Sequence, residues 1–371
     1  MSGKRRARTV GLAVLLLAVA TACGTSAAPG AVSAGTRSAS GAAGTPDGQI
    51  VELGSGLLMP LMKIWAATYG QQVPGVTVRV NGGGSGLGIA SAMDGKADIG
   101  ASDAYLSGGD LVKAPSLLNI PLAVSAQLVI YNLPGLSQGS HVKLNGQVLA
   151  GMYDGAITRW NDPAIAKLNP SLPLPDIKVV PVHRSDSSGD TFLFTSYLST
   201  QDLVWNNDRG YGTTVAWPPV SAAIAASGSN TTLADCARIR GCVAYNGISY
   251  LTQTLADRLG YAALANAVGR YTLPTPAAIR AAAAPFVALT PPNETISLID
   301  GPAAAGYPIL NYEYAIVSTR QPDPAKASAV KAFLNWVITT GNSPTYVSRV
   351  NFEPLPQAVA ILAGQQIARI G

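Results

Sequence analysis

Residues 49–103 read QIVELGSGLLMPLMKIWAATYGQQVPGVTVRVNGGGSGLGIASAMDGKADIGASD, and their pattern decides the fold class. Short β-rich runs alternate in this stretch with helical patterns, which predicts strands at 50–53, 76–80 and 98–101 and helices at 57–69 and 86–94. Strands that alternate with helices are typical of an α/β fold with parallel strands. We therefore expect an α/β protein.

The alternation continues beyond this stretch. Further strands are predicted at 177–182 and 243–245, further helices at 191–198 and 330–340, and apolar runs that cross between lobes at 128–132 and 309–317. A chain of 371 residues is long enough for two domains, or for one body with two lobes.

Composition limits the classes of function. Hydrophobic residues make up 48% of the chain and charged residues only 12%, which indicates a packed globule rather than a disordered chain. The net charge is +5, but four of the basic residues lie within the first eight positions. The rest of the chain is almost neutral, so it has no basic stripe of the kind that binds nucleic acid.

The first 48 residues predict export and anchoring. Basic residues at 4–8 and an apolar run at 11–22 are typical of a secretory signal, predicted to span 1–22. Residues 20–23 (Ala-Thr-Ala-Cys) resemble the bacterial lipobox, which predicts acylation of Cys23, for example with palmitate; ordinary cleavage nearby, leaving a free thiol, is the alternative. The Gly-, Ala-, Ser-, Thr- and Pro-rich segment that follows predicts a flexible tether, so that 23–48 is the lipidated cysteine with its tether.

The other two cysteines predict a disulfide. Cys236 and Cys242 are close in the sequence and are the only cysteines after Cys23. In an exported protein, such a pair forms a disulfide because the surroundings are oxidising. A zinc site needs more ligands than these, and the only histidines of the chain are His141 and His183. We expect no metal and no cofactor.

Three predicted strand-to-helix junctions have the chemistry of anion sites. They read LGSG at 53–56, NGGGSG at 81–86 and RSDSSGD at 184–190. The start of a helix presents unpaired N–H groups and the positive end of its dipole, where glycine allows close approach and serine adds a donor. A serine before a helix is usually only an N-cap, so one such junction would be weak evidence, whereas three together favour an anion site.

Asp103 ends a fourth segment, GASD at 100–103. It could be an ordinary turn residue. Beside an anion, however, a carboxylate can only accept a hydrogen bond, so it would tolerate an oxyanion that still carries a proton and repel one that does not. At neutral pH this favours phosphate over sulfate.

Three further motifs stand out: GAITRWNDPAIAKLN at 155–169, GTTVAWP at 212–218 and YPILNYEYA at 307–315. With the three junctions, they make the chain, from about Val51 onward, resemble the PstS family of phosphate-binding proteins of bacterial phosphate ABC importers, in particular its lipid-anchored forms. The resemblance implies a type II periplasmic-binding-protein fold, with two α/β lobes joined by two hinge strands. It places lobe 1 at 49–127 and 309–371, and lobe 2 at 128–308.

The resemblance also implies the site. The expected phosphate-binding residues are Ser55, Gly56, Leu57, Ser85, Asp103, Arg184, Ser188, Gly189 and Asp190, with Asp186 orienting Arg184. Gly56 departs from the family because it lacks a hydroxyl group. One neutral hydrogen bond is worth about 0.5 to 1.5 kcal/mol, so the sequence predicts tighter binding for Gly56→Thr unless the loop has adapted around glycine. Asp190 could accept a second ligand proton, or it could pair with Arg184 or cap the helix at Thr191.

The function implied is that of a monomeric receptor on the outer face of the cell membrane, anchored by lipid alone. It would capture inorganic phosphate and pass it to the permease and ATPase subunits of an ABC importer, without breaking a bond.

Three alternatives stay open. The Gly-Ser loops could belong to an exported serine hydrolase or phosphatase, but Ser85 does not stand in G-x-S-x-G, Ile89 follows where a P-loop has lysine, and His183 is more typical of a packing residue than of a general base. The protein could bind another oxyanion such as sulfate or molybdate, which Asp103 disfavours. The missing hydroxyl at Gly56 could mark a low-affinity sensor or an adhesin.

Overall fold

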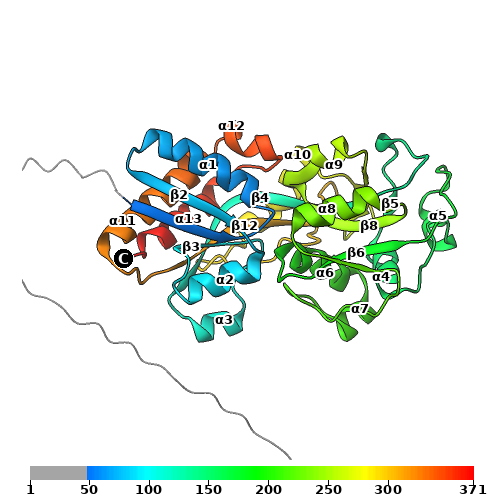
Figure 1. The fold of residues 1–371 in the computed structure, drawn as a ribbon, viewed down its shortest axis with the longest axis horizontal. Coiled ribbons are helices and arrows are strands. Elements are labelled where there is room, and N and C mark those ends of the chain that lie inside the picture. Colours follow the sequence, from blue (N-terminus) through cyan, green and yellow to red (C-terminus); the bar gives the residue numbers. More distant parts are fainter. Residues whose placement is uncertain (1–47) are drawn as a thin grey trace, which may run out of the picture. The chain divides into compact units, whose positions relative to one another are not determined.

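The computed structural model describes residues 48–371 (Figure 1). The predicted signal peptide, the acylated Cys23 and all but the last residue of the tether lie outside these residues. Within the described range, none of the helices combines the length and the apolar character needed to cross a membrane.

The first lobe begins with the three predicted strands. β1 (Gly48–Gly54) lies between β2 (Val76–Gly82) and β3 (Ile99–Ser102), and both pairings are parallel. The connecting helices are α1 (Met59–Gln72) and α2 (Ser85–Met93), and α3 (Gly108–Lys113) follows β3. Because parallel strands end at the same edge, the residues after β1 and β3 lie at one edge of the sheet.

Two long antiparallel strands lie where the chain passes between the lobes. β4 (Leu117–Tyr131) is buried along its whole length and pairs with β12 (Leu310–Ser318) as far as Ala126. From Gln127 onward, β4 pairs with β8 (Cys242–Gly247) instead. β12 pairs on its other side with β3, so these two strands make the sheet continuous in the order β2-β1-β3-β12-β4-β8-β6-β7 (Figure 1).

The second lobe extends this sheet with β6 (Val180–Arg184) and β7 (Ile224–Ala226), both parallel to β8. Two of its helices begin near the ends of these strands: α6 (Gly189–Gln201) follows β6, and α8 (Ser229–Arg238) follows β7. The remaining elements of this lobe are α4 (Gly146–Asp154), α5 (Pro163–Leu168), α7 (Leu203–Asp208), α9 (Leu251–Ala256), α10 (Pro276–Val287), β9 (Gly260–Tyr261), and a small sheet of β5 (Lys143–Leu144), β10 (Ala263–Ala265) and β11 (Tyr271–Thr272).

The chain returns to the first lobe through β12. The helices that follow are α11 (Pro324–Trp336), α12 (Pro344–Val347) and α13 (Gln357–Ala368). α11 starts earlier than the helix predicted at 330–340, because Asp323 caps it by accepting from the N–H of Lys326 (2.7 Å) and proline occupies its first position.

The predicted fold class is confirmed: the protein is an α/β protein with two lobes and two shared strands. One predicted strand is shorter than expected, since β6 begins at Val180 rather than at 177. The backbone of the preceding residues pairs elsewhere: Trp160 N–H donates to the carbonyl of Ile177 (3.0 Å), and Val179 N–H donates to the carbonyl of Thr158 (2.9 Å).

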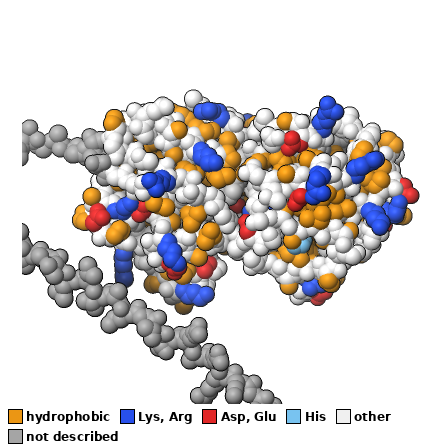
Figure 2. Space-filling view, viewed as in Figure 1, with side chains coloured by type: hydrophobic (Ala, Val, Ile, Leu, Met, Phe, Trp, Pro, Cys, Tyr) orange, Lys and Arg blue, Asp and Glu red, His pale blue; other side chains and the backbone are white. Residues whose placement is uncertain are grey.

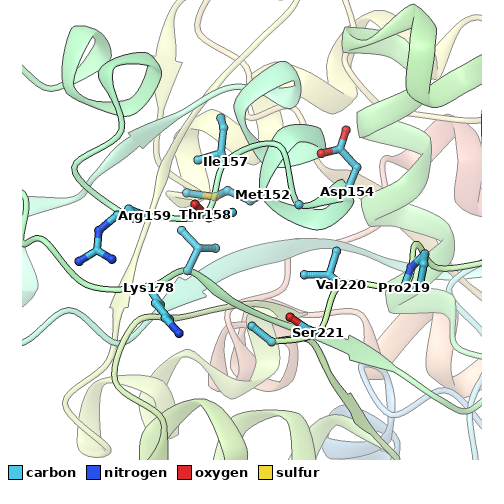
Figure 3. A pocket seen from close by; sticks show the side chains of 12 residues that line it. Met152, Asp154, Ile157, Thr158, Arg159, Lys178, Pro219, Val220 and Ser221 are labelled. Carbon is cyan, nitrogen blue, oxygen red and sulfur yellow. The ribbon is translucent and has the colours of Figure 1, made fainter.

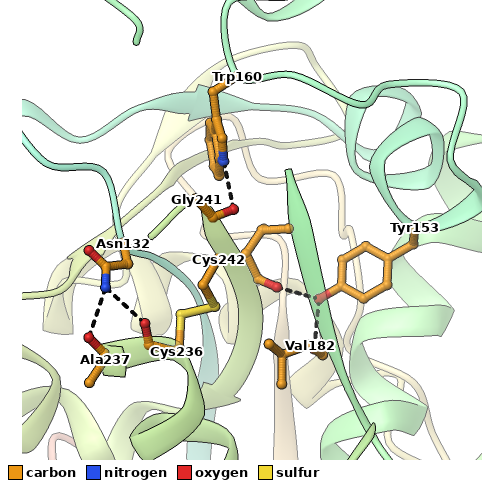
Figure 4. Close-up of a disulfide and its surroundings, with 9 residues drawn as sticks. Asn132, Tyr153, Trp160, Val182, Cys236, Ala237, Gly241 and Cys242 are labelled. Atoms are coloured by element: carbon orange, nitrogen blue, oxygen red, sulfur yellow. Dashed lines mark hydrogen bonds between the residues drawn. A yellow bond between two sulfur atoms is a disulfide. The ribbon is translucent and has the colours of Figure 1, made fainter. Parts of the chain in front are cut away.

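The predicted disulfide between Cys236 and Cys242 is present, with a Cα–Cα distance of 5.3 Å (Figure 4). It ties the end of α8 to the start of β8. The Asn132 amide donates to the carbonyls of Cys236 (3.0 Å) and Ala237 (2.9 Å), and the Trp160 indole donates to the carbonyl of Gly241 (2.8 Å), so hydrogen bonds hold the same loop.

Charged side chains are distributed sparsely over the face seen in Figure 2. Basic side chains lie singly or in small groups on both lobes, with acidic side chains among them. This face shows no continuous basic stripe, in keeping with the low charge of the chain.

Candidate anion-binding site

The predicted site residues meet between the two lobes. Ser55 follows β1, Ser85 begins α2 and Asp103 follows β3, whereas Arg184 ends β6 and Asp190 lies in the first turn of α6. Each of these five side chains is at most 3% exposed. The structure thus places carboxyl ends of strands and N-termini of helices from both lobes around one buried point, an arrangement typical of ligand sites in α/β proteins.

The first lobe fixes the carboxylate of Asp103. The Ser55 hydroxyl donates to this carboxylate and accepts from the N–H of Leu58 (2.9 Å). The Ser85 hydroxyl accepts from the backbone N–H of Asp103 (2.9 Å). Burial, together with the charge of Asp190, raises the pKa of Asp103 to about 6.

The second lobe fixes the guanidinium of Arg184. Its Nε donates to Asp186 (2.7 Å) and its Nη2 donates to the other oxygen of the same carboxylate, so Asp186 holds the guanidinium by two hydrogen bonds. Its Nη1 donates to Asp190 (2.7 Å). This cation is buried and held from two sides.

Asp190 forms an ion pair with Arg184 in this structure, the second of the possibilities that the sequence left open. Its carboxylate also accepts from the hydroxyl of Ser229 (3.2 Å) and from the amide of Gln127 (3.1 Å). It does not cap α6, whose N-cap is Ser188, and the Ser188 side chain makes no capping bond. Burial raises the pKa of Asp190, and Arg184 opposes this shift.

The two lobes touch directly at the site. A β-carbon at Gly189 would overlap Asp103 and Ser85 of the opposite lobe, so only glycine fits there. Gly86 of the first lobe donates its N–H to the carbonyl of Ser187 in the second (3.0 Å). The surrounding side chains are therefore closed off from solvent by contacts between the lobes.

Leu57 and Gly56 belong to the same contact between lobes. Leu57 is fully buried, and its carbonyl accepts from the Ser249 hydroxyl of the second lobe (2.8 Å). A β-carbon at Gly56 would lie 2.7 Å from the Ser229 hydroxyl. The loop is therefore adapted to glycine, and a serine of the other lobe fills the space beside it.

Ser229 lies at the site but is not among the residues that the sequence predicts for it. This residue begins α8, is 3% exposed, and lies 3.2 Å from the Nη1 of Arg184. A signal was present, because Gly228-Ser229 before a helix repeats the Gly-Ser pattern of the other junctions.

The buried polar residues of β4 and β12 were also missed. The Gln127 amide donates to the carbonyl of Asp190, and the Asn311 amide donates to the carbonyl of Asp103 (3.1 Å). Glu313 lies fully buried beside Asp103. A glutamate within an apolar strand was the visible signal for Glu313.

The arrangement does not resemble that of a serine hydrolase. His183 and Arg184 are neighbours on β6, where successive side chains point to opposite faces. The His183 ring stacks on Trp217 (4.7 Å between ring centroids). No group of three His, Cys, Asp or Glu in residues 48–371 is placed to hold a metal ion.

Several cavities lie outside the cluster, among them the following two. One of about 450 Å³, shown in Figure 3, is lined by Arg159, Lys178 and the segments 152–158 and 219–222, and it contains none of the predicted site residues. The other, of about 630 Å³, borders the site and is lined from both lobes, by α2 and Tyr105 on one side and by Ser187 and Tyr211 on the other.

Comparisons with known proteins agree with this geometry. Residues 39–340 match the family described as PBP superfamily domain. The chain is 34% identical over 319 residues to the phosphate-binding protein PstS of Methanocaldococcus jannaschii, covering 80% of this chain and 79% of that protein. It is 30% identical to the phosphate-binding protein PstS of Xylella fastidiosa (strain Temecula1), covering 82% of this chain and 80% of that protein.

Solved structures show the same fold. The phosphate-binding protein PfluDING, solved with phosphate, is 22% identical and superposes with a TM-score of 0.67, covering 84% of this chain and 92% of that one. The phosphate-binding protein from Stenotrophomonas maltophilia is 18% identical with a TM-score of 0.65, covering 86% and 94%. From its matched sequence and its two-lobed fold, the chain belongs to the PBP superfamily and, within it, to the PstS family of phosphate-binding proteins.

Proposed function

We propose that this protein binds inorganic phosphate between its two lobes and delivers it to the permease and ATPase subunits of a phosphate ABC importer. The observation that carries the proposal is the convergence of Arg184 from one lobe and Asp103 from the other at a single buried point. A cation attracts the anion, and an acceptor carboxylate selects an anion that still carries a proton.

The roles of the residues follow from their chemistry. Arg184, the hydroxyls of Ser55, Ser85 and Ser188, and the backbone N–H groups of the loop at 56–57 and of 189–190 would donate to phosphate oxygens. Asp103 would accept the phosphate proton, and Asp186 would hold Arg184 in place. We add Ser229 to this set, because its hydroxyl lies beside Arg184 and Gly56.

Binding of this kind breaks no bond, so the proposed protein is a receptor and not an enzyme. We propose lobe 1 at 49–127 and 309–371 and lobe 2 at 128–308, with the lobes closing on the anion. A lipid on Cys23 and the tether at 23–48 would hold this monomeric receptor at the outer face of the cell membrane.

Titration calorimetry on the purified chain, freed of bound anion, tests the proposal with phosphate, arsenate and sulfate. Phosphate and the similarly protonated arsenate should bind, and sulfate should bind at least about 10⁴-fold more weakly, because the buried acceptor would have no proton to receive. Asp103→Asn should reduce this discrimination. Comparable affinity for sulfate and phosphate at neutral pH would instead favour a receptor for another oxyanion.

A further inference from the structure

Glu313 is a third buried carboxyl group at the site. It lies in β12, is fully buried, and is within hydrogen-bonding reach of the Asp103 carboxyl group. Two buried carboxylates within hydrogen-bonding reach of each other cannot both stay ionised without a cation between them. Therefore one proton belongs to the pair.

The hydrogen-bond donors indicate which atom holds that proton. Oε1 of Glu313 accepts from the Asn311 amide (3.2 Å) and faces the hydroxyl of Ser125. Oε2 is buried and has no donor among residues 48–371. A carboxyl oxygen that lacks any donor is best satisfied when it is itself protonated and donates. This places the proton on Oε2 of Glu313.

The surrounding charges agree. Arg184 is the cation of the site, and it is already paired with Asp186 and Asp190. Within the described part of the chain, Glu313 makes no ion pair. The titratable groups that face the pair are Asp190 and Arg184 from the second lobe, Tyr250 near Asp103, and Tyr314 on β12.

Neither tyrosine supplies the missing donor. The Tyr314 hydroxyl donates to the carbonyl of Glu294 (3.1 Å), and the Tyr250 hydroxyl donates to the carbonyl of Gly56 (3.2 Å). An ionised Glu313 would add a negative charge beside an anion site whose cation, Arg184, already pairs with two aspartates.

We propose that Glu313 holds a proton and donates it in a hydrogen bond to Asp103, so that Asp103 stays ionised and can accept the proton of the bound phosphate. Glu313 is then a positioning residue that acts through Asp103, and this inference rests on the proposed function. Burial and the charge of Asp103 raise the pKa of Glu313 well above its ordinary value. Burial raises the pKa of Asp103 to about 6, and its hydrogen bond with Glu313 limits that rise.

Two variants separate this role from packing. Glu313→Gln keeps an N–H donor for Asp103 but cannot ionise, and it should bind phosphate within about threefold of the native protein near neutral pH. Glu313→Leu keeps bulk but removes the donor, and it should bind at least about tenfold more weakly. Without the donor, Asp103 should ionise only at a higher pH, so the leucine variant should regain affinity as the pH rises.

Calorimetric affinities of both variants, measured from about pH 5.5 to about pH 8.5, provide the readout. The matched control is Glu294→Gln. Glu294 is also buried with both carboxylate oxygens unpartnered, and burial raises its pKa to about 9, but it makes no contact with Asp103. Its variant should keep the native profile. Equal weakening of Glu313→Gln and Glu313→Leu with an unchanged pH profile would overturn the inference, as would much tighter binding by Glu313→Gln.

Infrared spectra of the anion-free protein test the proton without any ligand. Buried Glu294, whose pKa burial raises to about 9, also contributes carboxylic acid absorption near neutral pH. The difference spectrum between the native protein and Glu313→Gln should therefore show the loss of one carboxylic acid carbonyl band that the Glu294→Gln variant retains. Absence of that difference overturns the inference even if phosphate binds. If the band is present and the native protein binds no phosphate, the proton assignment stands and the proposed function fails.

Discussion

Asp103 and Arg184 show how single residues acquire their roles from distant partners. Asp103 is held by Ser55 and Ser85 of its own lobe, whereas Arg184 is oriented by Asp186 only two residues away. Opposite charges from two lobes meet in a buried space, where electrostatic interactions are stronger than in water. Small changes at these residues should therefore alter affinity measurably.

The carboxylates of Asp103 and Asp190 together give a prediction of how phosphate affinity depends on pH. The raised pKa of Asp103, about 6, means that phosphate affinity should fall by up to about tenfold per pH unit below that value, because protonated Asp103 no longer accepts. Asp190 already accepts from Arg184 and Ser229. Asp190→Asn should therefore keep the native profile above about pH 7, whereas its acid limb should move to lower pH, because the charge of Asp190 helps to raise the pKa of Asp103. If affinity falls above about pH 7 only in the native protein, Asp190 receives a second ligand proton.

The structure reverses the expected effect of Gly56→Thr on phosphate affinity. A β-carbon there would displace the Ser229 hydroxyl, which contacts Arg184 and Asp190. Hydrogen bonds to charged groups are worth about 1.5 to 3 kcal/mol, so Gly56→Thr should weaken phosphate binding by roughly tenfold or more. Adding Ser229→Ala should recover part of the loss, and Ser229→Ala alone is the control. Tighter binding by Gly56→Thr alone would show that Ser229 moves aside at no cost.

At the scale of elements, α8 is held at both ends. Its first residue, Ser229, reaches the site, and its last turn is tied to β8 by the disulfide, in a loop that Asn132 and Trp160 also hold (Figure 4). The hydrogen bonds keep the position of the helix when the disulfide is absent, whereas the covalent link restricts the unfolded chain.

The double variant Cys236→Ala/Cys242→Ala should thus lose stability and keep function. For so short a loop the loss of unfolding free energy should be about 2 kcal/mol, measured by urea denaturation against the oxidised native protein. Phosphate affinity should change by less than about threefold. A large loss of affinity at unchanged stability would mean that the disulfide itself positions the N-terminus of α8.

At the scale of the whole described body, the proposed function requires the two lobes to close on the anion. β4 pairs with β12 in the first lobe and with β8 in the second, and the contacts across the site include glycines that face the opposite lobe, among them Gly86 and Gly189. A side chain at such a position blocks closure without removing any group that binds the anion.

Gly86→Ala should therefore weaken phosphate binding by about tenfold or more, because its β-carbon would overlap the Ser187 side chain. Small-angle scattering should show that phosphate compacts the native protein and not this variant. Adding Ser187→Gly should restore closure, and Gly108→Ala, with no atom within 4 Å of its added carbon, should behave as native. A Gly86→Ala variant that binds and compacts normally would contradict the closure requirement.

The sequence by itself determined the α/β class, the disulfide and the junctions that meet at the site, because these depend on local patterns: strand and helix periodicity, a six-residue cysteine separation, and Gly-Ser sequences before helices. Only the tertiary structure decided the pairing of Asp190 with Arg184, the occupation of the space beside Gly56 by Ser229, and the contact of Glu313 with Asp103. The last two join residues far apart in the chain, and all three depend on how helices and strands pack, which local patterns do not encode.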